Sequence, residues 1–176
     1  MKANRTLILN TLLLVVFYSC TPENPTPNPT PTPTIAIGQS YQGGKIAYIL
    51  QAGEIGYDAN VQHGLIAAPS DQGTAEWGCY GTEISGADGT AIGTGAQNTI
   101  DIMNGCSEVG IAARLCGDLV LGGYSDWYLP SLDELNQLYI NRVAIGGFAN
   151  YYYWSSTEYD NLVMILIIRS SNWCTT

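Results

Sequence analysis

The sequence predicts one folded domain that mixes helices with short strands and long ordered loops. A glycine turn precedes an apolar segment at 43–50, which has the form of a strand. Ser131 and Glu134 have the spacing of a capping box at the start of a helix. An aromatic run at 151–159 has the composition of a further strand. The 176 residues leave room for this domain and for accessory segments.

The first 19 residues have the layout of an export signal. Two basic residues precede an apolar run that extends from Leu7 to Tyr18. The run is short for a membrane span and ends at the small residue Ser19. Because Cys20 follows directly, the segment resembles a bacterial lipoprotein signal in which Cys20 carries the lipid. An ordinary signal peptide with a coincidental cysteine is the alternative.

Residues 21–34 read TPENPTPNPTPTPT, a composition that cannot bury a core. We expect an extended, polyproline-like tether, which at roughly 3.1 Å per residue reaches on the order of 40 Å; a disordered linker without defined reach is the alternative. The expected organisation is therefore a signal peptide at 1–19, the lipidated Cys20 and tether at 20–34, and a folded domain at 35–176. This organisation predicts a protein of the outer membrane or cell surface that meets the membrane through its lipid anchor only.

The charge of the chain restricts its partners. Without residues 1–19, four basic residues face all 15 acids, so the net charge is 4 − 15 = −11. Such a surface repels nucleic acids and anionic headgroups. A neutral glycan or a protein is the better expectation for a partner, and the sequence predicts no oligomeric state.

The first half of the domain contains a probable hairpin and a long loop. The strand at 43–50 and the apolar segment 64–68, which Pro69 closes, could pair with each other. Between Ser70 and Gln97 no sustained period of either kind exists, which predicts ordered loop with short strands at most. A loop of this length is either functional or held by cross-links.

Cross-links are available in the form of four further cysteines in an oxidising compartment: Cys79, Cys106, Cys116 and Cys174. Four cysteines allow three pairings, and free buried thiols are the alternative. No cysteine or histidine pair has the spacing of a zinc site. The sequence predicts neither a metal nor a cofactor.

Three helical segments are expected. Asn98 and Thr99 can cap the first, and Gly105 interrupts it. The second, at 111–119, has apolar residues at four-residue spacing, with Cys116 near that face, where a bridge to Cys79 or Cys106 would staple the helix to the preceding loop. The third begins near Leu132 and turns its leucines to one face. We expect its polar residues, Asp133, Glu134 and Gln137, on the other face.

Two motifs in this order carry a resemblance to a known family. The first is W-x-L-P-[ST]-x-x-E-L, with Trp127, Pro130, Ser131 and Glu134; the second is YWSS-[ST]-E, with Trp154 and Glu158. Together with the segments 77–82 and 110–116 they resemble the DUF1566 family, also called the Lcl C-terminal domain, in the version common in Bacteroidetes surface lipoproteins. The resemblance implies an α+β, C-type-lectin-like domain with two main helices, and a binding role rather than an enzymatic one.

The chain departs from the family in two respects. A characterised member binds sulfated glycosaminoglycans, and a mature charge of −11 contradicts that ligand class. From about residue 161 the basic, aromatic family ending is replaced by a continuous apolar run, Leu162 to Ile168. This run can be a fully buried strand, or it can be out-of-frame translation of a truncated gene, which we expect.

No catalytic motif accompanies these signals, and His63, the lone histidine, has no sequence-evident partner. We therefore predict a binding and adhesion module and no enzyme. A structural component of a surface assembly and an enzyme of the formylglycine-generating type are the alternatives. The residues expected to contact a ligand are aromatic or acidic: Trp77, Tyr80, Tyr124, Asp126, Tyr151 and Tyr153. A core position is the alternative for the aromatic residues, above all for Trp127 and Trp154.

Overall fold

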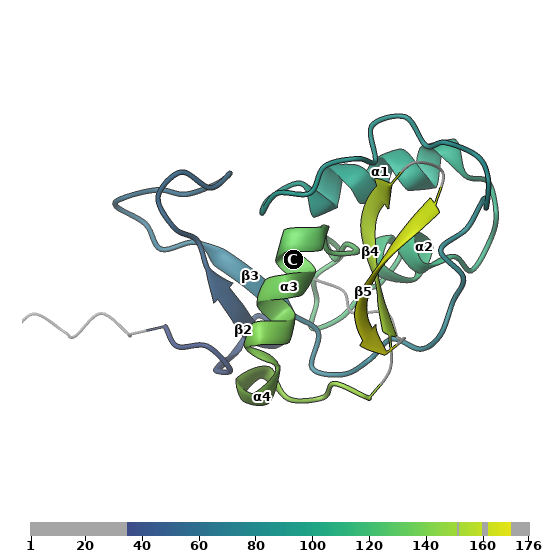
Figure 1. The fold of residues 1–176 in the computed structure, drawn as a ribbon. Coiled ribbons are helices and arrows are strands. Elements are labelled where there is room, and N and C mark those ends of the chain that lie inside the picture. The colour runs from purple at the N-terminus through teal and green to yellow at the C-terminus, as the bar shows by residue number, and fades with distance from the viewer. Residues whose placement is uncertain (1–34, 151, 160–161, 170–176) are drawn as a thin grey trace, which may run out of the picture. The chain divides into compact units, whose positions relative to one another are not determined.

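The computed structural model describes residues 35–150, 152–159 and 162–169 (Figure 1). The predicted signal peptide, Cys20, the tether, Tyr151 and Cys174 lie outside these residues. None of the helices in the described part has both the length and the apolar character needed to cross a membrane.

The described residues form a mixed α/β fold with four helices and two small antiparallel sheets. The first sheet has the order β1-β2-β3 and the second pairs β4 with β5. The helices are two more than the main ones expected, and the additional ones are short. The elements, in chain order, are β1 (Ser40–Tyr41), β2 (Gly44–Ile49), β3 (Gly64–Ala67), α1 (Gly95–Gly105), α2 (Ala112–Gly117), α3 (Leu132–Ile140), α4 (Arg142–Ile145), β4 (Tyr152–Tyr159) and β5 (Leu162–Arg169).

The predicted hairpin is confirmed, since β2 pairs antiparallel with β3, with Lys45 opposite Ala67 and Ile49 opposite Gly64. A shorter strand, β1, extends this sheet through a two-residue turn, Gln42 and Gly43. Both turn residues have positive φ, 46° and 85°, as a tight hairpin turn requires. Glycine adopts this conformation without strain, whereas Gln42 does not.

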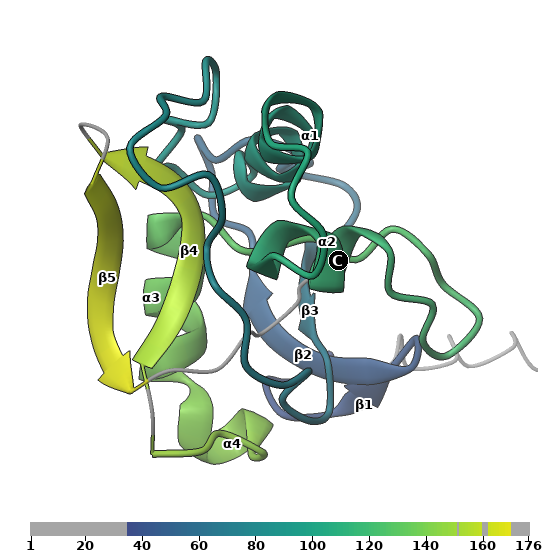
Figure 2. The ribbon, with the colours of Figure 1, turned by 90° about the vertical axis from the view of Figure 1, so that its right-hand side faces the viewer.

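Helix α3 contacts both sheets, and it lies between them in Figure 1 and behind β4 and β5 in Figure 2. Its buried residues Leu135 and Leu138 pack with Ala47 and Leu65 of the first sheet and with Tyr153 of β4. Burial of an aliphatic side chain contributes roughly 1.5–3 kcal/mol. The leucine face read from the sequence is therefore the face that joins the two sheets.

The capping box at the start of α3 is confirmed, but the expectation that Glu134 is on the polar face is wrong. Its carboxylate is fully buried and accepts hydrogen bonds from the backbone N–H groups of Ser131 (2.8 Å) and Gly93 (2.8 Å) and from the Tyr128 hydroxyl (3.2 Å). The first residue of α1 approaches the start of α3 so closely that a Cβ on Gly95 would lie 2.7 Å from the Ser131 nitrogen. Burial raises the pKa of Glu134, although the hydrogen bonds from Ser131, Gly93 and Tyr128 act in the opposite direction.

The N-cap of helix α1 is Thr94, four residues before Asn98, the first residue of the expected cap. Asn98 and Thr99 lie buried inside the helix, where Asn98 donates to the Gly89 carbonyl (2.6 Å) and the Thr99 hydroxyl accepts from the Leu129 N–H group (3.0 Å). Their side chains fasten the helix to neighbouring segments instead of capping it. The side-chain amide and hydroxyl that suit these residues to a cap can equally bond to distant backbone groups when the residues are buried.

Helix α2 is shorter than the 111–119 segment suggests, and Arg114 connects it to the end of α1. The guanidinium donates to the carbonyls of Met103 (2.7 Å), Cys106 (2.8 Å) and Glu108 (3.0 Å). These carbonyls lie at or just after the C-terminus of α1, where a cation is favourable. The charge of Arg114 is thus used within the fold.

The loop expected between Ser70 and Gln97 contains no strand, although its last three residues belong to α1, and a disulfide holds it. Cys79 is bonded to Cys106, the residue that follows α1, with a Cα–Cα distance of 5.7 Å. This pairing confirms that a cross-link holds the loop, but the expected bridge from Cys116 to Cys79 or Cys106 is wrong, because these two cysteines bond to each other. Cys116 is disulfide-bonded as well, and it is fully buried in a different cluster, against Trp127 and Leu129.

The apolar run at the end of the chain forms β5, which pairs antiparallel with β4, with Tyr159 opposite Leu162. Of the two alternatives given for this run, a strand or out-of-frame translation, its backbone has the form of a strand. On its other side β4 is held by distant segments, because Ser156 donates to the Pro130 carbonyl (2.8 Å) and Glu158 to the Ala87 carbonyl (2.7 Å). The second family-like motif is thus tied directly to the first.

Candidate binding site

Two of the predicted ligand-contacting aromatics are wrong, because they are buried. Trp77 is 4% exposed, and its indole N–H donates to the Ser155 carbonyl (2.9 Å). Tyr153 is fully buried, and its hydroxyl bonds to the backbone of Ala149. Since β4 turns Tyr153 inward, its neighbour Tyr152, which was not among the expected contact residues, faces solvent and is 45% exposed.

The remaining predicted contact residues are at the surface but do not gather around a described pocket. Tyr80 is 83% exposed and Asp126 is exposed. Tyr124 is half-buried in a tight turn, where its N–H donates to the Leu121 carbonyl (3.1 Å). The pockets described below are lined by other residues.

The two tryptophans and two further residues of the family-like motifs make internal contacts. Trp127 is 2% exposed, and the indole of Trp154 donates to the Ala75 carbonyl (2.8 Å). Pro130 accepts the bond from β4, and Glu158 accepts from the Ile84 N–H group (2.6 Å). Together with Ser131 and Glu134, these residues tie the helix start, the long loop and β4 together.

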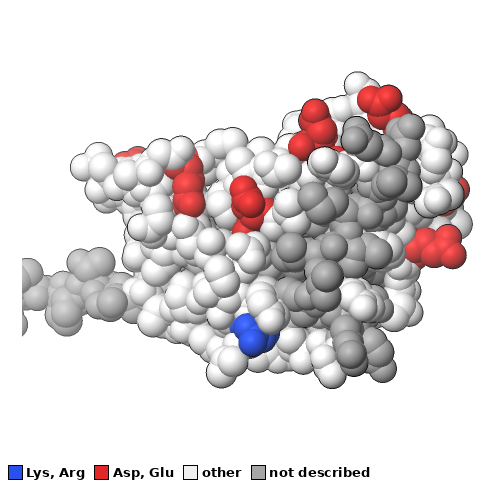
Figure 3. Space-filling model, in the orientation of Figure 1, with Lys and Arg blue, Asp and Glu red and all other residues white. Residues whose placement is uncertain are grey.

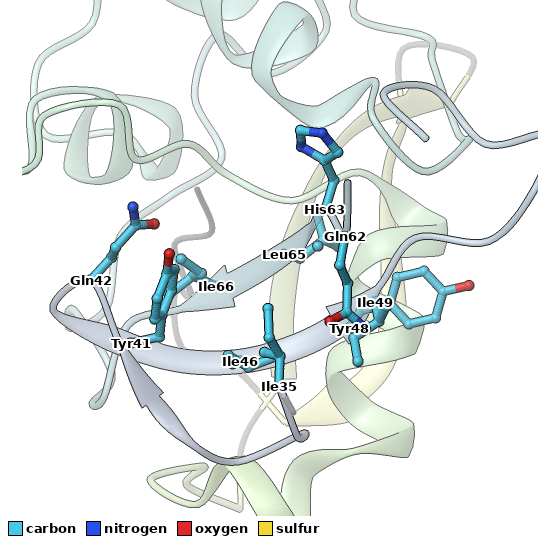
Figure 4. Close-up of a pocket in the computed structure, with 11 residues that line it drawn as sticks. Ile35, Tyr41, Gln42, Ile46, Tyr48, Ile49, Gln62, His63, Leu65 and Ile66 are labelled. Carbon is cyan, nitrogen blue, oxygen red and sulfur yellow. The ribbon is translucent and has the colours of Figure 1, made fainter. Parts of the chain in front are cut away.

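A pocket of about 320 Å³ opens on the first sheet (Figure 4). Strands β1 to β3, the turn residue Gln42, Ile35 and the residues just before β3 supply its lining. Its apolar lining residues are Ile35, Ile46, Ile49, Leu65 and Ile66, of which Ile46, Leu65 and Ile66 are almost wholly buried in the core. Its polar lining residues are uncharged, namely Tyr41, Gln42, Tyr48, Gln62 and His63. We call this the sheet pocket.

Four of the polar groups around the sheet pocket have no hydrogen-bond partner within the described protein: the Tyr41 hydroxyl, the amides of Gln42 and Gln62, and the His63 imidazole. Tyr48 differs, since its hydroxyl donates to Glu54 Oε1 (2.8 Å). Burial, followed by this bond and the charge of Glu54, raises the pKa of Tyr48 to about 12. Tyr48 is thus a fixed neutral wall of the pocket. The other four side chains are exposed to water, and His63 interacts electrostatically with Asp58.

The sheet pocket carries no Asp, Glu, Lys or Arg in its lining, although the chain as a whole has a net charge of −9. A second groove, of about 610 Å³ between the loop 83–90 and the end of β4, differs sharply because it contains Glu83, Asp88 and Glu158. Acidic side chains also spread over the upper part of the face in Figure 3, with one basic group below. The sheet pocket is therefore an uncharged site in an acidic chain.

One described cluster has ligand atoms close enough for a metal ion: Cys79, Cys106 and Glu108. Its two sulfurs form the disulfide, so they are not available as thiolates, and the Glu108 carboxylate accepts the Cys79 N–H group (3.0 Å). In this state the cluster is a cross-link.

No family model matches this chain, and no curated protein matches it either.

The sheet pocket contains none of the ligand-contacting residues expected from the sequence. Its lining comes from the two ends of a hairpin whose loop spans 50–63, and no local pattern marks those ends as neighbours of Ile35. One feature of the sequence could have drawn attention to this pocket. Gln42 precedes Gly43 at a turn where asparagine or glycine is preferred, and a residue that is unfavourable for the turn is a candidate for a functional position.

Proposed function

We propose that this chain is a surface-anchored binding and adhesion module that recognises a neutral glycan or a protein partner. In this proposal the domain is a C-type-lectin-like member of the DUF1566 family, held off the membrane by a tether that is lipidated at Cys20. The observation that carries it is the sheet pocket, an uncharged and solvent-accessible site with unused hydrogen-bonding groups in an acidic chain. Binding pockets typically combine an apolar lining with a few polar groups that orient the ligand.

The absence of charge from the lining argues for an uncharged ligand. A charged ligand that enters an apolar pocket loses its hydration and requires an opposite charge in compensation. The lining of the sheet pocket offers no such charge, whereas its amides and hydroxyl can each bond to a neutral polar group.

The two alternatives have less support. An enzyme of the formylglycine-generating type requires reactive thiols, and the bond between Cys79 and Cys106 occupies two of the candidates. A structural component of a surface assembly requires no pocket with unused polar groups, so the sheet pocket favours the binding function over it.

The test compares two tyrosine variants of the full chain, both at exposed positions. Tyr41 lies at the sheet pocket, whereas Tyr80 belongs to the surface expected from the sequence. The full chain is presented on vesicles to a glycan array and to extracted surface proteins. We expect a ligand that binds wild type and Tyr80→Ala equally and Tyr41→Ala at least about tenfold more weakly.

Two results would contradict this proposal. If neither glycans nor proteins bind the full chain, the binding function fails. If Tyr80→Ala abolishes binding and Tyr41→Ala does not, the module binds through the surface around Tyr80 instead of the sheet pocket.

A further inference from the structure

We infer that Cys116 forms a disulfide with Cys174, so that the segment after β5 is fastened covalently to helix α2. Cys174 lies outside the described residues, and this bond assigns it a chemical role. Three observations support the inference: the bonded state of Cys116, the number of cysteines in the chain, and the place where β5 ends.

Cys116 is disulfide-bonded, yet its partner is neither of the other two cysteines in the described part of the chain. Cys79 and Cys106 are bonded to each other, and a sulfur atom takes part in only one disulfide. Since the chain has five cysteines, the partner of Cys116 is either Cys20 or Cys174.

Cys20 is the weaker candidate, because it is the residue that we propose to carry the lipid. A sulfur that carries a lipid cannot also form a disulfide, since both bonds use the same valence of the atom. This step rests on the proposed function. The position of β5 supports Cys174 independently of the lipid anchor.

The end of β5 lies near the cluster of buried residues that contains Cys116. Arg169, the last residue of β5, is paired with Tyr152, two residues before Trp154 in β4. Residues two apart in a strand are separated by about 7 Å. Trp154 packs against the cluster that contains Cys116. The five residues from Arg169 to Cys174 span up to about 17 Å, so Cys174 can reach α2.

The surroundings of Cys116 suit a permanent cross-link. Its side chain is fully buried and packs with Ala112, Trp127 and Leu129. Disulfides that exchange readily are strained or exposed, because an attacking thiolate must reach one of the two sulfurs. A bond at Cys116 is shielded from such attack and is therefore structural.

Formation of the bond is an oxidation that requires an electron acceptor. The thiols of Cys116 and Cys174 lose two protons and two electrons as one S–S bond forms. By thiol–disulfide exchange, these protons and electrons pass to the disulfide of an oxidoreductase, whose S–S bond breaks to give two thiols. The bond between Cys79 and Cys106 requires the same class of oxidant, which an oxidising compartment supplies.

The bond would hold the last described strand in place. Among the described strands, β5 pairs only with β4, and it contains seven consecutive apolar residues before Arg169. Apolar strands at the edge of a sheet tend to pair with other chains. A covalent link five residues after β5 opposes its separation from β4. It also makes the tail part of the domain, which argues against out-of-frame translation.

Digestion with trypsin separates the possible pairings, because the enzyme cleaves after Lys and Arg. Cys79 and Cys106 both fall in the peptide 46–114, Cys116 falls in 115–142, and Cys174 falls in 170–176. Cys20 precedes Lys45 and therefore remains in a fourth peptide. The full chain is exported in a bacterium, extracted from membranes with detergent, treated with iodoacetamide to block free thiols, and digested without reduction.

We expect mass spectrometry to find the peptide 115–142 linked to 170–176, and reduction to release the two peptides separately. Cys79→Ala should leave this link unchanged, because the two bonds share no sulfur. The peptide map is made with the wild-type chain, so its result does not depend on the folding of a variant.

Cys174→Ser tests what the bond does, with Ser171→Ala in the same segment as the matched control. The bond closes a segment of 174 − 116 = 58 residues, so its loss should lower the melting temperature by about 10 °C. Self-association in gel filtration should increase, because β5 is held less firmly. Ser171→Ala should match wild type in both measurements.

Three results would overturn the inference. Alkylated Cys116 in the wild-type chain would show a free thiol. A link from 115–142 to the peptide with Cys20 would refute the pairing and also remove the proposed lipid anchor. A dimer on a non-reducing gel that reduction converts to monomer would mean that the bond joins two copies. Failure of the chain to bind glycans or proteins would affect only the proposed function, since the peptide map involves no ligand.

Discussion

Replacement of Glu134 tests whether one buried carboxylate holds three segments of this domain together. Its two oxygens accept bonds from the N–H groups of Ser131 and Gly93 and from the Tyr128 hydroxyl. Ser131 and Glu134 belong to the same helix start, whereas Gly93 is 41 residues away in the sequence. Glu134→Ala removes all three bonds, and Glu134→Gln keeps the shape but replaces one acceptor with a donor.

The structure sets the expected magnitude. Glu134→Ala leaves two backbone N–H groups unsatisfied in a fully buried site, at about 1–3 kcal/mol each, and also creates a cavity. We expect a loss of about 3–5 kcal/mol in the free energy of unfolding, or about 10–15 °C in melting temperature for a domain of this size. Glu134→Gln leaves one N–H group facing an amide donor, so it should cost about 1–3 kcal/mol.

The assay is chemical denaturation of the full chain at neutral pH, followed by circular dichroism. Asp133→Asn is the matched control, because Asp133 occupies the same helical turn but is exposed. Its loss affects mainly the interaction with the helix dipole, so we expect a change of about 0.3–1 kcal/mol. The predicted order of stability is wild type, Asp133→Asn, Glu134→Gln and Glu134→Ala.

The result that would refute this reasoning is a Glu134→Gln variant as stable as Asp133→Asn. Glutamine fills the same space as glutamate, so equal stability would mean that the second acceptor oxygen contributes nothing. Failure of Glu134→Ala to fold would not by itself decide the matter, because the milder substitution provides the measurement.

Three further predictions concern the bridge, the pocket wall and the end of α1. The Cys79→Ala, Cys106→Ala double variant opens a loop of 27 residues and should lose about 3.5 kcal/mol of unfolding free energy in denaturant; a loss below about 1 kcal/mol would contradict it. Tyr48, whose folded pKa is about 12 against 10.0 for a free phenol, should contribute stability that is complete below pH 10 and is lost between pH 10 and about 12. Tyr48→Phe should remove a tyrosine that ionises near pH 12 from an absorbance titration, and unchanged curves would show that another residue titrates there. The lysine of Arg114→Lys cannot reach all three carbonyls, so this variant should lose about 1.5–3 kcal/mol of unfolding free energy. Arg142→Lys, whose arginine makes a single carbonyl bond to Tyr139, should lose less. The reverse order in thermal unfolding would refute the role given to Arg114.

Local signals in the sequence predicted the elements well. The start of α3 was located by Ser131 and Glu134, which lie three residues apart and satisfy each other's backbone groups. The hairpin of β2 and β3 followed from two apolar segments with glycine and proline at their ends. Such signals depend on contacts within a few positions, and the tertiary structure did not override these two, whereas it did override the cap signal of Asn98 and Thr99 in α1.

Side-chain orientation was predicted less well. The aromatic run was expected to be a strand, but its parity was left open, and Tyr153 points inward because α3 and the first sheet pack there. Glu134 was placed on a solvent-facing side, yet the loop that contains Gly93 covers it. In both cases a segment far away in the sequence determines which side of an element is buried.

The sequence by itself determined where the strands of the hairpin and helix α3 form, that the long loop lacks regular structure, and that the chain is strongly acidic. These properties depend on composition and on neighbours within about four residues. Only the tertiary structure decided that Cys79 pairs with Cys106, that Glu134 and Tyr153 are buried, and that an uncharged pocket forms over β1 to β3. The physical reason is that burial and pocket shape arise from contacts between distant segments, which no short pattern in the chain records.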